Sequence, residues 1–259
     1  MFLVKSCFQK DNVFDRETIR IGTLDEYRHT ERKEIADAFE GNFKFVLDLR
    51  DTHIHQEVLK TINHSQHGYL SLHGREIHYM GPSPVVNNSL FFKRYNATIE
   101  MTNLNRFVFC MSCVENHTDS KRIFKEYDDY WYFNTDRTGI IRQEMSKSLL
   151  KEILKKEKNG EKIFKGDYEV SKLRIKCTSQ EIEYKHRNLY VNNDSFYKNI
   201  DNICNTATGI SYIKPDSYKH EKEVRFIFDF YEDDKLLHPT LKYMIVNVDI
   251  GFIKLLRKA

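Results

Sequence analysis

The stretch His220-Glu-Lys-Glu-Val-Arg-Phe-Ile-Phe228 decides the expected fold. Side chains alternate between the two faces of a strand. This alternation predicts a charged face and an apolar face, made of Glu221, Glu223 and Arg225 on one side and Val224, Phe226 and Phe228 on the other. Such a strand suits the wall of a ligand cleft. The same pattern is also found in a solvated edge strand, and Arg225 could simply pair with Glu223.

Apolar runs on both sides of this stretch predict further strands. The most continuous is Arg106-Phe-Val-Phe-Cys-Met-Ser-Cys-Val114, which is typical of a buried strand. Shorter runs predict strands at residues 2–8, 18–24, 43–49, 130–133, 138–142, 222–230 and 242–249.

Helical periodicity is clearest over residues 145–158. Its apolar stripe consists of Leu149, Leu150, Ile153 and Leu154, and Asn159-Gly160 ends the segment. Shorter helices are expected at 119–128, with Asp119 as the N-cap, and at about 195–205.

Mixed strands and short helices without a regular βαβ rhythm predict an α+β fold with mostly antiparallel strands. The 259 residues are 40% hydrophobic and 13% aromatic, which is enough for a sizeable core. We expect a single domain over 1–259. It would carry a His-rich insertion of short strands and loops at about 50–90.

The overall composition limits which partners we expect the protein to bind and where in the cell we expect to find it. The net charge of +3 gives no strong global attraction to nucleic acid or membrane. No apolar run approaches the roughly 18 residues of a membrane span, and the apolar start Met1 to Phe8 is too short for a signal peptide. Five scattered cysteines fit reduced thiols. The expected location is the cytoplasm, with no membrane partner.

Histidine and cysteine patterns do not predict a metal site. Six of the eleven histidines lie between His53 and His78, including His53-x-His55 and His64-x-x-His67. Cys110-x-x-Cys113 lies in an expected strand, where the two sulfurs point to opposite faces and chelate poorly. The sequence also lacks a Walker or Rossmann glycine pattern and a nucleophile elbow.

Several short motifs occur in a fixed order along most of the chain. They are Ile19-Arg-Ile-Gly-Thr-Leu-Asp-Glu-Tyr-Arg28, Asp37-x-x-Glu40, Phe109-Cys-Met-Ser112, Tyr127 to Trp131, and Tyr218-Lys-His-Glu-Lys-Glu-Val-Arg225. In this order the sequence resembles a bacterial family of uncharacterised domains related to ADP-ribosyltransferases. Some relatives are toxins of a toxin–antitoxin–chaperone anti-phage system that modify RNA. The sequence departs from the family at Leu3-Val-Lys-Ser6, where a His-Tyr pair is missing, and at Ala38, which replaces Pro.

The resemblance implies an ADP-ribosyltransferase-like fold and NAD as the substrate. It also implies a toxin or anti-phage effector that an antitoxin protein neutralises. The acceptor would be nucleic acid, either RNA or single-stranded DNA, gripped in part by the basic run Lys151 to Lys158. Cleavage of the bond between nicotinamide and ribose develops positive charge on the ribose. Glu223 would stabilise that charge, and Glu221 would assist the acceptor.

The remaining candidates would hold the dinucleotide. Arg28, helped by Arg20, would bind the phosphates, and Tyr27 or Tyr127 would pack on nicotinamide. Ser112 is a candidate cofactor-binding residue on the basis of the resemblance alone. A turn at Asp25-Glu26 would fold Arg28 back towards the site.

Three alternatives stay open. Arg28 could form a surface ion pair with Glu40, which would contribute little to stability. Glu221 and Glu223 could bind a divalent metal ion in a nuclease. The protein could also be a binding module without catalytic activity.

Overall fold

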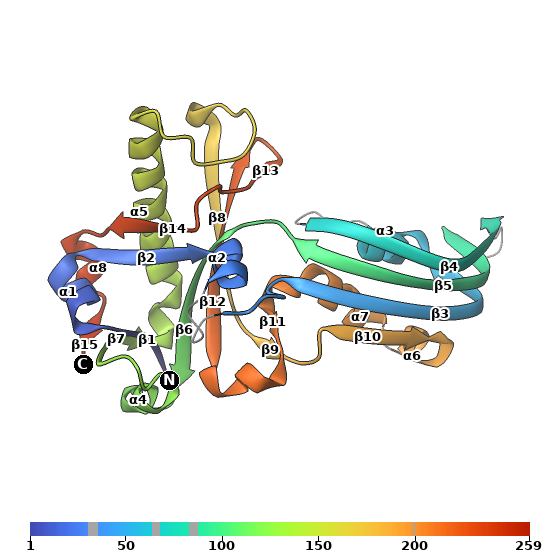
Figure 1. Cartoon of the computed structure of the whole chain (residues 1–259), viewed down its shortest axis with the longest axis horizontal. Coiled ribbons are helices and arrows are strands. Elements are labelled where there is room, and N and C mark those ends of the chain that lie inside the picture. Colours follow the sequence, from blue (N-terminus) through green and yellow to red (C-terminus); the bar gives the residue numbers. More distant parts are fainter. Residues whose placement is uncertain (31–35, 64–67, 83–87, 199) are drawn as a thin grey trace. The chain divides into compact units, whose positions relative to one another are not determined.

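The computed structural model describes residues 1–30, 36–63, 68–82, 88–198 and 200–259. The chain forms two compact units (Figure 1). Unit 1 consists of Met1–Glu40, Asn105–Glu183 and Ser217–Ala259, and unit 2 consists of Gly41–Leu104 and Tyr184–Asp216. Strands pair mostly antiparallel and most helices are short, which confirms the expected α+β class.

Unit 1 is built on an antiparallel sheet that has nine strands within the described residues. These are β1 (Phe2–Cys7), β2 (Thr18–Thr23), β6 (Phe107–Val114), β7 (Asp129–Asn134), β8 (Leu173–Glu181), β12 (Glu223–Glu232), β13 (Lys235–Leu237), β14 (Tyr243–Asn247) and β15 (Arg257–Lys258). The main path runs β13-β12-β6-β1-β7-β15, while β2 and β8 branch from β6 and β12, and β14 pairs with β2. The strands expected at 2–8, 18–24, 106–114, 130–133, 222–230 and 242–249 are confirmed to within a few residues.

The sheet divides at β6. One edge of β6 pairs with β12 continuously from Phe107 to Ser112. On the other edge, β1 pairs with residues 112–114 and β2 pairs with residues 107–108. Among the described strands, none pairs on this edge with residues 109–111. We call this division, where β1 and β2 leave the same edge of β6, the fork.

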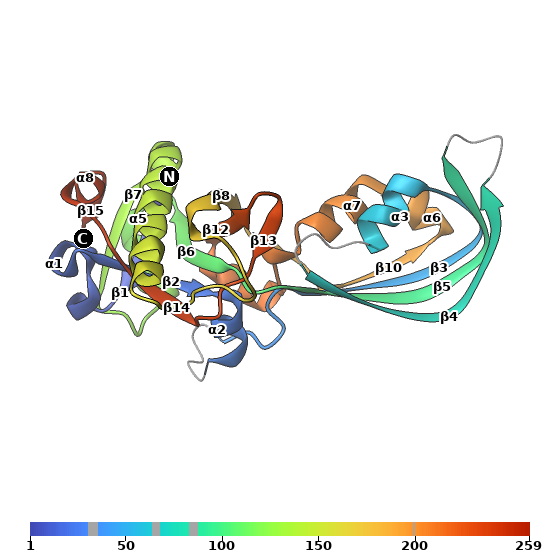
Figure 2. The same cartoon turned by 90° about the horizontal axis from the view of Figure 1, so that it is seen from above.

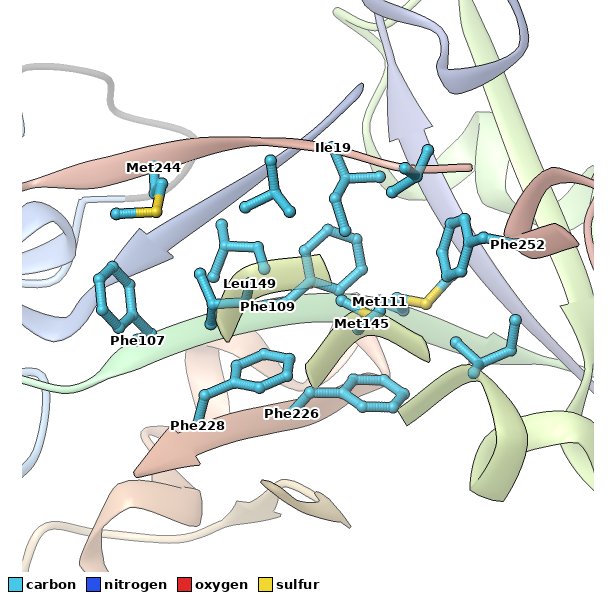
Figure 3. Close-up of a cluster of buried hydrophobic side chains, with 14 of the residues drawn as sticks. Ile19, Phe107, Phe109, Met111, Met145, Leu149, Phe226, Phe228, Met244 and Phe252 are labelled. Atoms are coloured by element: carbon cyan, nitrogen blue, oxygen red, sulfur yellow. The ribbon is translucent and has the colours of Figure 1, made fainter. Parts of the chain in front are cut away.

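The core of unit 1 lies between the sheet and the long helix α5 (Thr138–Lys158). Figure 3 shows Met145 and Leu149 of α5 among phenylalanines of β6 and β12. The prediction of a strand at 138–142 was wrong, because α5 begins at Thr138 and buries Ile141 on the same stripe. Leu154, expected in that stripe, is 38% exposed.

Shorter elements complete unit 1. They are the α-helices α1 (Val13–Arg16), α2 (Leu24–His29), α4 (Ser120–Ile123) and α8 (Ile250–Ile253), and the 3-10 turns η1 (Gln9–Asp11), η2 (His117–Asp119), η3 (Thr135–Arg137), η4 (Val170–Lys172) and η6 (Asp216–Glu221). The helix expected at 119–128 covers only one turn, and the Asp119 side chain makes no capping hydrogen bond within the described residues.

Unit 2 contains a sheet in the order β10-β3-β5-β4, with helices on one of its faces (Figure 2). Its elements are β3 (Asn42–His55), α3 (Gln56–Asn63), β4 (Gly68–Pro82), β5 (Ser89–Asn103), β10 (Asn188–Asn192), α6 (Asn193–Lys198), α7 (Ile200–Thr208) and η5 (Ile210–Tyr212). A short two-stranded pair joins β9 (Glu183–Tyr184) and β11 (Ile213–Lys214). The core gathers side chains of β3, β5, α3, α6 and α7.

One prediction about unit 2 was wrong and another was confirmed. Residues 50–90 do not form short strands and loops, because β3, β4 and β5 continue through this region as strands of 14 to 15 residues. The helix expected at about 195–205 is confirmed for the described residues on both sides of position 199, which belong to α6 and α7. His64 and His67 of the His-rich segment lie outside the described residues.

Candidate functional site

A pocket of about 450 Å³ occupies the fork in unit 1. Its floor and walls come from β1, β2 and β6, and further side chains come from the Phe8–Arg16 connection, β7 and β14. The described lining residues are Lys5, Ser6, Cys7, Phe8, Lys10, Asp11, Arg16, Thr18, Ile19, Arg20, Gly22, Tyr27, Val108, Phe109, Cys110, Tyr127, Trp131, Tyr243 and Ile245. We refer to this cavity as the fork pocket.

The lining is cationic and aromatic. The described lining residues include four basic side chains and one acidic side chain. The basic ones are Lys5, Lys10, Arg16 and Arg20, and the acidic one is Asp11. Aromatic side chains are spread around the wall, and the rings of Phe8 and Tyr127 meet edge to face with centroids 5.0 Å apart. Cations bind phosphate and aromatic faces pack on flat rings, so the fork pocket suits an anionic ligand that carries a planar group.

Arg20 is held in place from two sides. Its guanidinium lies over the Tyr243 ring, 4.1 Å from the centroid, and ion-pairs with Glu26. Glu26 is buried, and its Oε2 has no hydrogen-bond partner within the described part of the chain. A methyl group on Gly22 would lie 2.6 Å from that oxygen. The absence of a side chain at Gly22 therefore makes room for the carboxylate that positions Arg20.

Three polar groups meet at the floor of the pocket. The Lys5 Nζ donates a hydrogen bond to the Cys110 carbonyl over 3.0 Å, at the part of β6 that lies between β1 and β2 in the fork. The Tyr27 hydroxyl lies 3.4 Å from the Cys110 Sγ. Burial lowers the pKa of Lys5, and it raises the pKa of Tyr27, with Cys110 adding to the second effect. Both groups are therefore shifted towards their neutral forms.

Glu223, the predicted catalytic carboxylate, belongs to a buried ion-pair network. Its Oε1 accepts a hydrogen bond from the Arg225 Nε over 2.8 Å, which confirms the pairing of these two residues. Arg225 also binds both carboxylate oxygens of Glu40, and the exposed fractions of the three side chains are 4% or less. Burial alone would lower the pKa of Arg225, but the carboxylates of Glu223 and Glu40 raise it well above its ordinary value.

Glu221 does not share a strand face with Glu223. It ends the 3-10 turn η6, and Lys222 has a φ of 48°. This left-handed residue interrupts the expected alternation. Ser112 lies opposite Glu223 on β6, and its hydroxyl donates to the backbone carbonyl of Glu221 over 2.7 Å. Ser112 thus fixes the chain before β12.

Arg28 lies on α2 rather than after a turn. The Thr23 side chain caps this helix by accepting a hydrogen bond from the Glu26 amide. The Arg28 Nε donates to the Glu40 carbonyl over 2.7 Å, and its Nη1 pairs with Asp25 over 2.9 Å. The expected surface pair with the Glu40 carboxylate was wrong, because that carboxylate is buried and bound to Arg225.

The fork pocket therefore brings together Arg20, Tyr27 and Tyr127 of the predicted residues. Arg28, Ser112, Glu221 and Glu223 are not among its described lining residues. Glu223 nevertheless acts electrostatically on two residues that line it, Lys5 and Tyr27.

Sequence reasoning missed Lys5 and Cys110. One signal was available for Lys5, a cation in line with Leu3 and Cys7 on an apolar strand. No local sequence pattern predicts the fork, because the strands that form it lie far apart in the sequence.

The described residues contain no group of three or more His, Cys, Asp or Glu side chains placed to hold a metal ion. No described helix has both the length and the apolar character needed to cross a bilayer. Comparisons with protein-family models, curated proteins and solved structures gave no significant match to this chain.

Proposed function

We propose that the fork pocket binds NAD and that the protein transfers the ADP-ribosyl group to a macromolecular acceptor. The observation that carries this proposal is the pocket lining, in which Arg20, Tyr27 and Tyr127 occur with further cations and aromatic rings. A pyrophosphate needs cations or N–H donors, and nicotinamide and adenine need flat apolar contacts. The resemblance in motif order supports NAD as the dinucleotide.

In the proposed reaction, the bond between ribose C1′ and the nicotinamide nitrogen breaks, and nicotinamide leaves with the electron pair. The acceptor nucleophile bonds to C1′ and loses its proton to solvent. Positive charge grows on the ribose as the bond breaks. Glu223 is the proposed carboxylate that stabilises this charge, since its field reaches the pocket residues Lys5 and Tyr27.

The proposed acceptor is RNA or single-stranded DNA, and the proposed context is a toxin or anti-phage effector neutralised by an antitoxin protein. Both follow from the resemblance. The basic end of α5, with Lys155, Lys156 and Lys158 in its last turn, supports a nucleic-acid contact. Such contacts weaken steeply between about 50 and 200 mM salt. If the affinity for short oligonucleotides does not depend on salt, a protein acceptor would be favoured over nucleic acid.

A second candidate is a nucleotide-binding module without catalysis. The observation that favours it is the burial of Glu223 and its hydrogen bond to Arg225, which also holds Glu40. A carboxylate engaged in this way has less freedom to face a ribose.

Two measurements on the full chain separate these candidates. Thermal unfolding with NAD, ADP-ribose and inorganic phosphate tests binding, because a ligand at 100 times its Kd stabilises by about 2.7 kcal/mol. Incubation with labelled NAD and separate pools of RNA, DNA and protein tests transfer. Stabilisation without label or released nicotinamide would favour the binding module. The absence of stabilisation by NAD would reject both candidates.

A further inference from the structure

Lys5 is placed as a reactive group at the floor of the fork pocket. It is half-buried on β1, and its Nζ lies 4.8 Å from the centroid of the Phe109 ring and 3.0 Å from the Cys110 carbonyl oxygen. These contacts fix the position of the nitrogen. The carbonyl uses only one N–H, so a neutral amine keeps this hydrogen bond and still has its lone pair for reaction.

The surroundings shift Lys5 towards the neutral amine. Burial is the largest influence on Lys5 and lowers its pKa, and Arg20 acts in the same direction. Cys110, Glu223 and Cys7 oppose this effect without reversing it. The nearby Cys7 thiol, in contrast, has a pKa raised by burial to about 12 and stays protonated at neutral pH. Of these two nucleophiles in the pocket, the amine is therefore the one that is activated.

The other lining residues indicate which kind of ligand would bind beside the Lys5 amine. Lys10, Arg16 and Arg20 supply positive charge for a phosphate group. Trp131 and Tyr127 provide aromatic surface. Lysines with shifted pKa values in such settings form imines with carbonyl compounds.

We propose that Lys5 is a nucleophilic amine that forms an imine with a phosphorylated aldehyde or ketone bound in the fork pocket. The lone pair of Nζ attacks the carbonyl carbon, the two amine protons leave with the carbonyl oxygen as water, and a C=N bond remains. This inference is independent of NAD as a substrate.

The probe is pyridoxal 5′-phosphate with borohydride, which delivers hydride to the imine carbon and leaves a stable secondary amine. We expect peptide mapping by mass spectrometry to place the adduct on Lys5 of the wild-type chain at substoichiometric reagent. Lys5→Arg keeps a donor for the Cys110 carbonyl but forms no imine. This variant should lose at least about 90% of the adduct, as expected when the activated nucleophile is removed.

The control is Lys254→Arg, which changes an exposed lysine that is not among the described lining residues of the fork pocket and should keep the Lys5 adduct. Pyridoxal without its phosphate should label Lys5 about tenfold less, the ratio that corresponds to 1.4 kcal/mol of binding. An adduct spread over exposed lysines in the wild-type map would overturn the proposal even if Lys5→Arg failed to fold. Equal labelling by pyridoxal would overturn the assignment to phosphorylated ligands.

Discussion

The guanidinium of Arg225 binds the carboxylate of Glu40 through two nitrogens, although the residues are 185 positions apart. The Nη1–Oε1 and Nη2–Oε2 distances are 2.7 and 3.2 Å. With the Nε bound to Glu223, the guanidinium holds the β12 strand and the end of the Asp37–Glu40 segment together. Loss of this shared cation would leave both carboxylates of the network buried without their partner, at a large cost.

Arg225→Met should therefore be strongly destabilising. It would leave Glu40 and Glu223 buried without their cation, and loss of one partner of a buried pair costs about 3–5 kcal/mol. Urea unfolding measures this difference. The control is Arg174→Met, since Arg174 is 64% exposed and its replacement should change stability by no more than about 0.5 kcal/mol. Equal midpoints for the two variants would show that the network contributes nothing to stability.

Glu223→Gln tests the proposed catalytic carboxylate. The amide keeps the size of the side chain, and Arg225 keeps Glu40, so the fold should persist. Transfer from labelled NAD should fall by about 100-fold or more, as expected when a charge that stabilises the transition state is removed. Glu181→Gln, a change at an exposed position of β8, serves as the control. Full transfer by Glu223→Gln would remove this residue from the mechanism.

Arg20→Ala and Arg28→Ala should separate ligand binding from stability. Arg20 lines the fork pocket, so its loss should weaken NAD binding by about tenfold to a hundredfold, the value of a charge-assisted hydrogen bond. Arg28 holds Asp25 and the Glu40 carbonyl, so its loss should lower the melting temperature and leave the Kd unchanged. Calorimetry and thermal unfolding measure both quantities. The reverse pattern would restore Arg28 as the phosphate ligand.

Gly22→Ala should disturb Arg20 indirectly. The new methyl group would meet the Glu26 Oε2 at 2.6 Å, and overpacking a buried site costs about 1–3 kcal/mol. Glu26 would have to move away from Arg20. Gly139→Ala in α5 is the matched control, because a Cβ there has nothing within 4 Å and the change should be neutral or stabilise by about 0.5–1 kcal/mol. Unfolding measurements that rank the two variants in the opposite order would contradict this interpretation.

Stability should fall at alkaline pH in a way that depends on Cys7. Burial raises the pKa of this thiol from 9.0 to about 12 in the folded state. Above the ordinary value, the unfolded chain releases the proton while the folded chain keeps it, so the stabilisation present below pH 9 is lost as the pH rises towards 12. Denaturant unfolding at intervals above pH 9 measures this loss. Cys7→Ala should show a shallower decline than the wild type, and parallel curves would be inconsistent with a raised pKa.

The sequence predicted six of the nine described strands of the unit 1 sheet because each of the six is a local apolar run, and it missed β8, β13 and β15. It misassigned Thr138 to Arg142 because the β-branched residues Thr138, Ile140 and Ile141 favour a strand locally. Packing of Ile141 with the α5 stripe instead stabilises the helix. In unit 2 it predicted the first half of β3, at 43–49, but it missed the long strands β4 and β5, because polar residues alternate along them, as in the β5 segment from Arg94 to Thr102.

The residues of the fork pocket were also predicted only in part. Arg20, Tyr27 and Tyr127 were recognisable as a cation and two aromatics near expected strands. Lys5 lies at the pocket floor because β1 and β2 leave β6 at the fork. The sequence does not show this arrangement, because it depends on pairing between strand residues more than a hundred positions apart. The separation of Glu221 from β12 depends on the backbone of one residue, Lys222, whose side chain gives no such signal.

The fork has a consequence for how this protein can diversify. The floor of the pocket belongs to strands that also hold the core, whereas Phe8, Lys10, Asp11 and Arg16 come from the short connection between β1 and β2. Replacements in that connection can alter ligand preference while leaving strand pairing intact. A library restricted to these four positions would explore new specificities at little risk to folding.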